Sequence, residues 1–449
     1  MARVFIYLVL FILLIVVAIK LTSENLSKTF ISRESNNCPV KNYGALVVDL
    51  NGDGIMLLPL ESSNAMFDLT GSGFANKVGW ISKGEAFLVW DKNEDGNIND
   101  ISELFGGLNQ SGFALLATYD FNKDGKIDSH DEIFFKLKLW RDSNGDGRTD
   151  KGELFSLSDA GIKSINLNPK QVDINRNGNK ITEISKVELE NGKQLSIAHV
   201  NFQVDRLYSY YNRDVKLVEE VIGLPWIKGY GFLPDLPIAM SLDSTLLKMV
   251  KDATEEQDLI VLLNKFERII YRWAKVDAAT PEELGLHLYI LQIDRTNRMV
   301  KFLDGEQMKI EQLGAISRFS GENFFELRCK GNTLDSRKMT AAWNTMFAGL
   351  LARFAVETEK VADVILAYYD FYVDRIVLED DFNIEEFEKR VKELLYSGDQ
   401  QKIAKGFLAL IIMNEHDSKR ALKLIKKLKN QLPQEVLSNP YATYALNLD

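Results

Sequence analysis

Cysteine and histidine are scarce in this sequence, with 2 and 4 among 449 residues. Two cysteines, Cys38 and Cys329, are too few for a disulfide scaffold, and one bridge or two free thiols both fit the sequence. The histidines are scattered, and neither a G-x-S-x-G nucleophile motif nor an H-E-x-x-H zinc motif occurs. The sequence therefore identifies no catalytic residues, and we do not predict an enzyme from it.

Positive charge is also in short supply. The formal net charge is -10 and the isoelectric point is about 5.2, which argues against general nucleic-acid binding. One basic stretch at residues 419–432, KRALKLIKKLKNQL, places leucine and isoleucine at helical spacing. A packed helix with a solvated basic face and a helix on an anionic membrane surface both fit this pattern.

A long hydrophobic run occurs at the amino terminus, where residues 4–19 are sixteen consecutive apolar residues. This length fits either an uncleaved membrane anchor or the core of a signal peptide. Lys20 follows the run at once, without the polar region that precedes a cleavage site, which favours the anchor. We therefore expect a single-pass transmembrane helix within residues 1–21 and a tether over 22–42. The remainder would be extracytoplasmic, in the periplasm or on the cell surface; cleavage would make it secreted.

A short acidic loop is the most abundant motif. The pattern Asp, any residue, Asp/Asn/Ser/Thr, any residue, Asp/Asn/Ser/Thr, Gly occurs six times, where about 0.1 matches are expected by chance. Ca²⁺ takes about six to eight oxygen ligands; positions 1, 3 and 5 supply them, and glycine at position 6 permits the sharp turn. The sequence therefore predicts calcium as a cofactor. The loops are DLNGDG from Asp49, DLTGSG from Asp68, DKNEDG from Asp91, DFNKDG from Asp120, DSNGDG from Asp142 and DINRNG from Asp173.

Two of these loops have complete ligand sets, each closed by a carboxylate at position 12. The predicted ligands of the first are Asp120, Asn122, Asp124, the Lys126 carbonyl, Asp128 and Asp131. The predicted ligands of the second are Asp142, Asn144, Asp146, the Arg148 carbonyl, Asp150 and Glu153.

The other four loops are less complete. Ser102 stands at position 12 of the Asp91 loop, so we expect Glu103 to close it, one residue late. The Asp49 loop has Leu60 at position 12, so an ion there must take oxygens from elsewhere in the fold. The loops from Asp68 and Asp173 are better explained as turns held by Asx hydrogen bonds. The predicted ligands are Asp91, Asn93, Asp95, Asn97 and Glu103 in one loop and Asp49, Asn51 and Asp53 in the other.

The sequence around the loops predicts a mixed α and β module over residues 43–205. Apolar residues at helical spacing in 111–119 and 130–140 predict helices that enter and leave the Asp120 loop, and 151–161 predicts a further short helix. Strand-like runs precede Asp49 and Asp91. Asn191-Gly192, within an alternating stretch, predicts a β-hairpin.

The order of these segments resembles the EF-hand-like calcium-binding module of iron-regulated RTX proteins, in which it is self-processing. The resemblance implies Ca²⁺ binding by a bacterial protein. A second segment, GYGFLPDLPIAMSLD from Gly229 followed by IIYRWAKVD, is similar to a stretch in large secreted RTX-type proteins. The first resemblance rests on ALVVDLNGDGI, FDLTGSGFANKVGWI, LVWDKNEDGNINDISELFGG, DFNKDGKID, LKLWRDSNGDGRTDKGEL and LSDAGIKSINL.

Self-processing modules of this kind cleave an Asp-Pro bond just before the first calcium loop. The corresponding pair here is Gly44-Ala45, and no Asp-Pro dipeptide occurs in the sequence. Calcium binding therefore carries over to the matching loops, while self-cleavage does not.

The expected fold is α+β, with an EF-hand-like α/β module (43–205), a connector (206–237) and a mostly helical domain (238–449), behind the transmembrane helix. Apolar residues recurring at three and four predict the helices of the last part. The predicted function is that of a membrane-anchored calcium-binding protein whose module is ordered by Ca²⁺ and whose helical domain binds an unknown protein partner. The alternative is a calcium-triggered protease or toxin-type enzyme.

Overall fold

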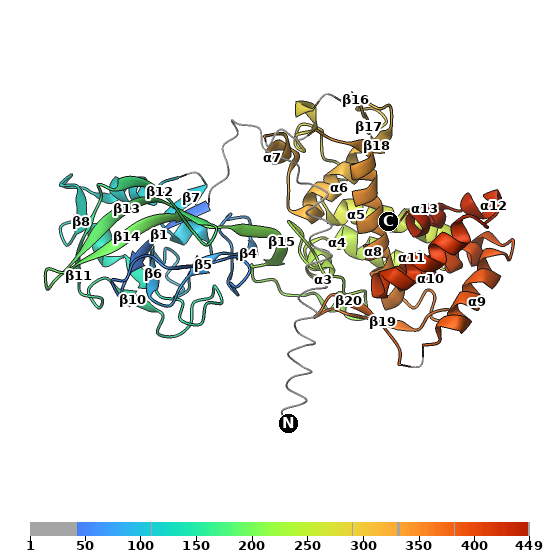
Figure 1. Cartoon of the computed structure of the whole chain (residues 1–449), viewed down its shortest axis with the longest axis horizontal. Coiled ribbons are helices and arrows are strands. Elements are labelled where there is room, and N and C mark those ends of the chain that lie inside the picture. Colours follow the sequence, from blue (N-terminus) through green and yellow to red (C-terminus); the bar gives the residue numbers. More distant parts are fainter. Residues whose placement is uncertain (1–42, 109, 290, 330–332, 381, 448–449) are drawn as a thin grey trace. The chain divides into compact units, whose positions relative to one another are not determined.

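The computed structural model describes residues 43–447 except 109, 290, 330–332 and 381 (Figure 1). These residues divide into two compact units, with the boundary between Asp214 and Val215. We call residues 43–214 the module and residues 215–447 the helical unit. The boundary falls within the predicted connector.

A ten-stranded antiparallel sheet is the frame of the module (Figure 1). All seven residues of its central strand, β1 (Tyr43–Asp49), are buried, because β1 lies between other strands and is covered on both faces. The order of the main path is β10-β9-β6-β1-β14-β13-β11-β8, while β12 pairs with β13 and β7 with β1. The bounds are β6 (Glu85–Val89), β7 (Gly106–Leu108), β8 (Lys126–Asp128), β9 (Lys138–Trp140), β10 (Leu154–Ser156), β11 (Ile162–Asn166), β12 (Lys170–Arg176), β13 (Asn179–Leu189) and β14 (Gln194–Asn201).

Two hydrophobic cores cover the two faces of this sheet. Val47 and Phe87 point into a core rich in aromatic side chains, where Trp80 and Trp140 pack with ring centroids 5.7 Å apart. Their neighbours in sequence, such as Val48, point into the other core, which is mostly aliphatic. Successive side chains of a strand alternate between faces, so an uninterrupted apolar run such as ALVV fills both cores at once.

Two smaller sheets complete the module. In the first, β15 (Val204–Tyr211) pairs with β4 (Phe74–Val78), which pairs with β3 (Met66–Phe67). In the second, β2 (Leu57–Leu58) pairs with β5 (Trp80–Ile81). β15 is the last strand before the unit boundary, and we call residues 204–213 the exit strand.

The prediction of an EF-hand-like α/β module is wrong, because the module is predominantly β. A short helix, α2 (Gly112–Leu116), followed by one 3-10 turn, does enter the Asp120 loop. The expected leaving helix is a single 3-10 turn at Glu132–Phe135, followed by strand β9. The helix expected at 151–161 is replaced by β10 and turns. β9 pairs with both β6 and β10, so sheet pairing overrides the helical spacing of residues 130–140.

The strand and hairpin predictions are confirmed. The runs before Asp49 and Asp91 form β1 and β6. β13 and β14 pair on either side of a turn that contains Asn191 and Gly192, and Gly192 has a φ of 81°. Glycine adopts this left-handed conformation at low cost, which is why Asn-Gly marks the turn in the sequence.

The second unit is mostly helical, as its periodicity predicts, with two small sheets in addition. Its long helix α8 and the mostly buried α10 pack together (Figure 1). The helices are α3 (Leu236–Leu242), α4 (Ser244–Glu255), α5 (Leu259–Trp273), α6 (Ile310–Ser320), α7 (Phe324–Cys329), α8 (Ser336–Glu357), α9 (Ile384–Leu395), α10 (Gln400–His416), α11 (Ser418–Lys429), α12 (Gln434–Leu437) and α13 (Pro440–Leu446); the sheets are β16 (Gln292–Asp294), β17 (Met299–Lys301) and β18 (Gln307–Lys309), and β19 (Ala367–Asp370) and β20 (Arg375–Leu378).

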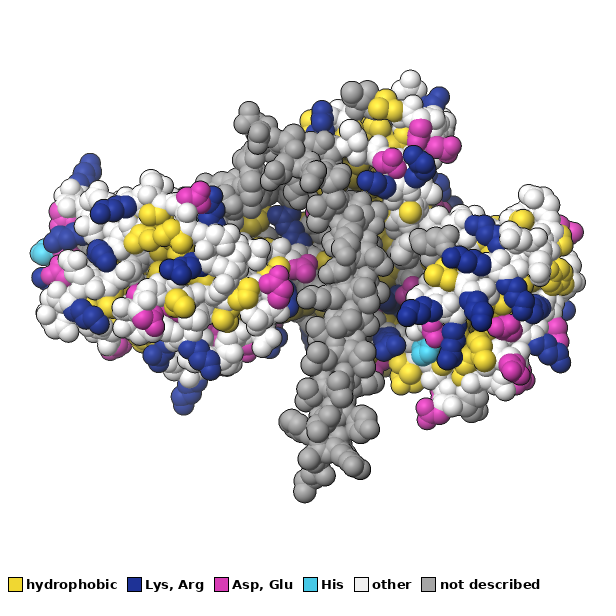
Figure 2. All heavy atoms as spheres, in the orientation of Figure 1, with side chains coloured by type: hydrophobic (Ala, Val, Ile, Leu, Met, Phe, Trp, Pro, Cys, Tyr) yellow, Lys and Arg dark blue, Asp and Glu magenta, His cyan; other side chains and the backbone are white. Residues whose placement is uncertain are grey.

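The basic stretch of the sequence forms α11. Its face with Ala421, Leu424, Ile425 and Leu428 is buried in the core of the unit. Figure 2 shows lysine and arginine side chains next to acidic ones over the part of the unit that contains α9 to α11. The packed-helix interpretation of this stretch therefore fits the structure.

The predicted membrane anchor must be corrected. Within the described residues, no helix is both long and apolar enough to cross a membrane. The segment for which the anchor was predicted, residues 1–21, lies outside the described residues, as do the tether and Cys38. The structure thus gives no support to a transmembrane helix or to the single-pass, extracytoplasmic location derived from it.

Candidate metal centre

Sheet strands position three of the acidic loops. Asp49 is the last residue of β1, Asp91 follows β6 by two residues, and Asp142 follows β9 by two residues. β1 and β9 both pair antiparallel with β6, so the Asp49 and Asp142 loops follow strands that run in the same direction. Each first aspartate is therefore fixed to a buried strand, while the rest of its loop lies nearer the surface.

Five loops share one backbone conformation. In each, positions 4 and 6 have a positive φ, as at Gly52 (82°) and Gly54 (99°), or at Lys123 (57°) and Gly125 (83°). In the Asp173 motif the positive φ values fall at positions 5 and 6, Asn177 and Gly178, which form the turn between β12 and β13. The Asp173 motif is thus a hairpin turn with a different geometry from the other five.

The first aspartate of each of the five loops accepts hydrogen bonds from the loop's own amides. Asp142 accepts from Gly145 N at 2.6 Å and from Gly147 N at 2.8 Å. Asp49 accepts from the glycine amides at the same two positions, at 2.7 and 2.8 Å. These bonds curl the loop around its first carboxylate, so that later side chains return toward it.

The asparagine at position 3 and the aspartate at position 5 are paired in four loops. Asn Nδ2 donates to Asp Oδ2 over 2.9 to 3.2 Å in every case. Both side chains are predicted ligands, so the structure brings them together at each loop. The pairs are Asn51 and Asp53, Asn93 and Asp95, Asn122 and Asp124, and Asn144 and Asp146.

The last carboxylate bridges the two ends of its loop. In the Asp142 loop, Glu153 accepts from the amide at position 2 (Ser143, 2.7 Å) and from the amide at position 9 (Asp150, 3.0 Å). Asp131 makes the same two bonds in the Asp120 loop, at 3.0 and 3.2 Å. A carboxylate held in this way stays within the loop that its first aspartate begins.

Glu103 takes the corresponding place in the Asp91 loop although it comes one residue later. Its Oε2 accepts from the amide at position 9, Asn99, at 2.8 Å. The Lys92 amide, at position 2, lies near the Glu103 carboxylate and lowers its pKa. Unlike the position 2 amides of the other two loops, it leaves one carboxylate oxygen, Oε1, without a hydrogen bond. The one-residue offset is absorbed by a 3-10 turn, Ile101–Glu103.

Asp91 and Glu103 each carry a buried carboxylate oxygen with no hydrogen-bond partner among the described residues. Both residues are 5% exposed. Burial raises the pKa of Glu103, and the neighbouring Asp95 and Asp91 raise it further. An unpaired buried carboxylate oxygen is costly, and a cation with oxygen ligands would remove that cost. The two unpaired oxygens of this loop are therefore of the chemical kind that binds Ca²⁺.

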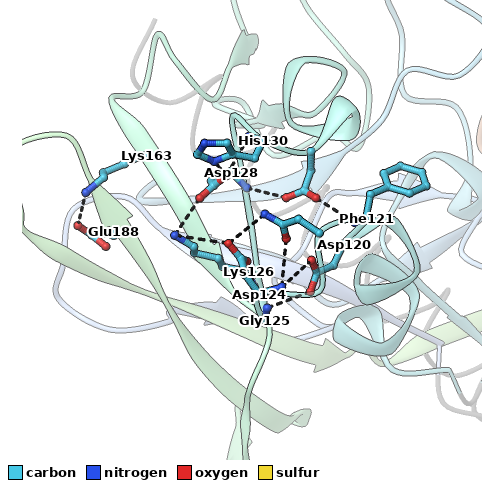
Figure 3. A network of polar contacts seen from close by, with 11 residues as sticks. Asp120, Phe121, Asp124, Gly125, Lys126, Asp128, His130, Lys163 and Glu188 are labelled. Carbon is cyan, nitrogen blue, oxygen red and sulfur yellow. Dashed lines mark hydrogen bonds and ion pairs between the residues drawn. The ribbon is translucent and has the colours of Figure 1, made fainter.

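The Asp120 loop holds its carboxylates differently (Figure 3). Asp128 Oδ2 pairs with Lys126 Nζ at 2.9 Å, and Asp128 Oδ1 accepts from the His130 amide at 2.9 Å. The His130 amide and Lys126 hold the Asp128 pKa down to about 2. Asp128 is thus charged and bound to two neighbours from positions 7 and 11, while Asp120 Oδ2 accepts from Gly125 N at 3.0 Å.

Asp142 is tied directly to the aromatic core. Trp80 Nε1 donates to Asp142 Oδ2 at 2.7 Å, and Asp142 is 1% exposed. Burial raises the Asp142 pKa, and hydrogen bonds from the loop amides and from Trp80 oppose that rise. Any charge bound at this loop is therefore coupled to the packing of Trp80.

Glu85 is a residue of the site that sequence reasoning missed. It is fully buried and lies directly across from Asp49 in the pairing of β1 with β6. Its Oε1 accepts from Met56 N at 2.9 Å and its Oε2 from Ser82 Oγ at 2.5 Å. Burial raises its pKa, with Asp49 and Asp53 adding to the rise. The pairing of two strands, which no local motif encodes, thus places a buried carboxylate opposite the first aspartate of a loop that lacks one at position 12.

The described residues contain no group of three or more His, Cys, Asp or Glu side chains arranged to hold a metal ion. The reason is that hydrogen bonds and ion pairs within the loops already occupy most of the predicted ligand side chains. Position 5 pairs with an asparagine, the last carboxylate bridges amides, and Asp128 is paired with Lys126. The predicted ligands are thus brought to each loop in turn, but their carboxylates do not point to one centre.

The loops also contact one another. Ile98 N in the Asp91 loop donates to Thr149 Oγ1 in the Asp142 loop at 2.9 Å. Ile101 N donates to the Asp68 carbonyl at 3.0 Å, which joins a third loop. Three of the five loops therefore form one connected set through the Asp91 loop.

Comparison with known proteins bears on this part of the chain. Residues 46–203 match the SPM domain. The chain is also 31% identical, over 246 residues, to iron-regulated protein FrpA of Neisseria meningitidis serogroup C; the match covers 53% of this chain and 22% of that protein. The chain thus spans about a fifth of the length of this relative. The comparisons support the predicted relation to the iron-regulated RTX proteins and a bacterial context.

The SPM segment, residues 46–203, ends immediately before the exit strand, and three loops of the segment contact that strand. Asn212 N donates to the Gly73 carbonyl at 2.9 Å, and Asn212 Nδ2 donates to the Asn99 carbonyl at 3.0 Å. The Arg148 guanidinium lies 5.8 Å from the centre of the Tyr210 ring. The Asp68, Asp91 and Asp142 loops thus all hold the last residues of the module.

A shallow pocket of about 220 Å³ in the module contains Ser111, Glu183 and His199. Ser111 Oγ donates to Glu183 Oε2 at 2.5 Å, and His199 Nδ1 accepts from Gly112 N at 3.2 Å. A nucleophilic relay requires the histidine between the hydroxyl and the carboxylate, whereas here the hydroxyl binds the carboxylate directly. The described side chains of this pocket therefore do not form such a relay.

Proposed function

We propose that the module is a calcium-binding domain, that Ca²⁺ orders its acidic loops, and that the ordered module supports a helical unit that binds a protein partner. The Asp120 and Asp142 loops are the first two sites in this proposal. The Asp91 loop with Glu103 and the Asp49 loop with Glu85 are the next two.

The observation that carries the proposal is the shared frame of the Asp120 and Asp142 loops. In both, the first aspartate accepts from the glycine amide at position 6, and the last carboxylate spans the amides of positions 2 and 9. This frame keeps the first and last carboxylates in one loop, with the side chains of positions 3 and 5 between them. The carbonyl at position 7 adds an oxygen of the kind that Ca²⁺ prefers.

Electrostatics explain why an ion would order the loops. Each of these four proposed sites gathers several carboxylates. Burial raises the pKa of Glu85, Glu103 and Asp142, which means that their charged forms are poorly solvated. A bound divalent cation would offset both the repulsion and the lost solvation. An ion that binds only the folded module stabilises it according to its concentration and affinity.

Exposed apolar and aromatic side chains of the helical unit support the partner-binding part of the proposal. In the helical unit, Ile222, Leu303 and Tyr372 are apolar or aromatic side chains with 76%, 78% and 92% of their surface exposed. Single exposed side chains of this kind are common on proteins, so they support a binding role without marking a site.

The test is thermal unfolding and limited proteolysis of the protein between 0 and about 5 mM Ca²⁺, a range that covers weak calcium modules. We expect Ca²⁺ to raise the melting temperature and to protect residues 43–214 from cleavage. An Asp173→Ala variant is the matched control, because that motif is a hairpin turn and its response should equal that of the unaltered protein. Identical melting and cleavage with and without Ca²⁺ would contradict the proposal.

A further inference from the structure

The Asp91 loop differs from the other four in the partner of its first aspartate. The Asp49, Asp68, Asp120 and Asp142 carboxylates accept from backbone amides and neutral side chains. In the part of the chain that the structure describes, Asp91 is the one first aspartate of the five with a lysine partner, Lys138, whose Nζ lies 3.0 Å from Asp91 Oδ2.

Strand pairing fixes the position of Lys138. It is the first residue of β9 and pairs with Val89 of β6, two residues before Asp91. Asp91 Oδ2 also accepts from Gly96 N at 3.2 Å, so the ammonium binds the oxygen that curls the loop. The Lys138 side chain is 39% exposed, whereas Asp91 is 4% exposed at its side chain.

Each of the two carboxylates of this site also has one unsatisfied oxygen. Asp91 Oδ1 and Glu103 Oε1 are buried and have no hydrogen-bond partner among the described residues. A divalent cation that binds these two oxygens would lie next to a carboxylate already paired with an ammonium. Like charges within a few ångströms repel, and partial burial of the pair weakens screening by solvent.

We propose that Lys138 makes the Asp91–Glu103 site the weakest calcium site of the module, so that this loop fills after the Asp120 and Asp142 loops. The inference rests on the proposed calcium binding of the module. Ca²⁺ at the Asp91 loop must share its first aspartate with the ammonium. In the Asp120 loop the lysine, Lys126, pairs with Asp128 at position 9 instead, and the first aspartate accepts only from backbone amides among the described residues. The loop joins the Asp68 and Asp142 loops and holds Asn212, so late filling would make the fixing of the exit strand depend on a higher Ca²⁺ concentration.

Other cations near the loop have other partners. Lys92 Nζ donates to the Ser102 carbonyl and lies 5.6 Å from the centre of the Trp90 ring. Lys136 Nζ pairs with Glu132 Oε1 at 2.5 Å and lies 5.9 Å from the same ring. Lys136 is therefore a matched control for Lys138, since it lies two residues away and also approaches Trp90.

The experiment is calorimetric titration of the full-length protein with Ca²⁺, comparing the unaltered chain with Lys138→Gln, Lys138→Arg and Lys136→Gln. We expect Lys138→Gln to tighten the weakest site about tenfold, because one positive charge is removed beside a divalent ion. Lys138→Arg keeps the charge and Lys136→Gln removes a distant one, so both should match the unaltered protein. Adding Glu103→Gln to Lys138→Gln should abolish the gain.

The outcomes separate this inference from the proposed function. One outcome is that the unaltered protein binds calcium but the Ca²⁺ affinity of its weakest site is the same or lower in Lys138→Gln. This result would overturn the role of Lys138 and leave the proposed function standing. A melting curve in EGTA shows whether the Lys138→Gln protein is folded. If it is not, Lys138→Met takes its place, and this variant must show the same tenfold gain in affinity. A Lys138→Met protein without that gain would overturn the role of Lys138. No calcium binding by any of the variants or by the unaltered protein would overturn both.

Discussion

Asp49 and Glu85 face each other across the pairing of β1 with β6, and Glu85 is fully buried. The sequence motif that begins at Asp49 contains no carboxylate at position 12, and in the proposed calcium site this cross-strand neighbour takes its place. A ligand set assembled from two strands depends on the register of the sheet, because a shift of one residue would turn Glu85 to the other face.

Replacing Glu85 by glutamine should weaken calcium binding at the Asp49 loop. The amide keeps the size of the side chain but loses the negative charge, so we expect about a tenfold loss at one site, with the Asp120 and Asp142 sites unaffected. Calcium titration measures it. Glu190→Gln, an exposed change in the β13–β14 turn, is the control. Equal binding by Glu85→Gln and Glu190→Gln would exclude Glu85 as a ligand.

Replacing Trp80 by phenylalanine should destabilise the module by about 1.5 to 3 kcal/mol, because Asp142 loses a hydrogen bond from the indole N–H while it stays buried. Trp140→Phe is the matched control. Trp140 packs against Trp80, but its Nε1 has no hydrogen-bond partner among the described residues. Urea unfolding in EGTA compares the two. A loss in Trp80→Phe no greater than that in Trp140→Phe would show that the hydrogen bond contributes nothing.

The module should lose stability as the pH falls below about 6.5, partly through His199. Burial lowers the pKa of this histidine in the folded state, while Glu183 opposes the shift. Between the lowered pKa and about 6.5 the unfolded chain binds a proton that the folded chain does not, so the free energy of unfolding falls as the pH falls, by at most about 1.4 kcal/mol per pH unit for one group.

A His199→Gln variant tests this pH dependence. Its free energy of unfolding, measured with urea in EGTA at several pH values between 7.5 and 5, should fall less steeply than that of the unaltered protein, even if the variant is less stable throughout. Parallel pH profiles for the two proteins would contradict the assignment to His199.

Calcium should protect the exit strand from hydrogen exchange. Gly73, Asn99 and Arg148, each from a different acidic loop, contact residues 210–212. Ordering these loops should slow amide exchange in residues 204–213 by at least about tenfold relative to EGTA, while amides in the buried core of β1 serve as the reference. Exchange in the exit strand that is the same in both conditions would show that the loops do not transmit binding to it.

The parts of the fold with strong local signals could be predicted from the sequence. ALVV before Asp49 and FLVW before Asp91 are continuous apolar runs and form buried strands, and Asn191-Gly192 forms the expected turn. The stretch IFFKLKLW has helical spacing, yet its second half pairs as β9 in the sheet, because pairing with β6 and β10 buries Leu139 and Trp140. The spacing of apolar residues within one segment does not reveal the burial that comes from pairing with distant strands.

In the candidate site, too, the sequence revealed the residues that belong to one loop and missed those that strand pairing brings to it. The first aspartates, the paired side chains at positions 3 and 5, and the late Glu103 were accessible from spacing within one loop. Glu85 and Lys138 were not, since both reach their loops through strand pairing. The Asp173 motif matches the loop pattern but forms a hairpin turn, because Asn177-Gly178 is itself a strong turn signal.

Calorimetric titration with Ca²⁺ of the protein and of its Asp120→Ala, Asp142→Ala double variant, with Asp173→Ala as the control, tests the central claim most directly. The account predicts that the unaltered protein and the control bind the same number of ions, at least two, and that the double variant loses two sites while keeping its fold in EGTA. No calcium binding by the unaltered protein, or unchanged binding by the double variant, would contradict it.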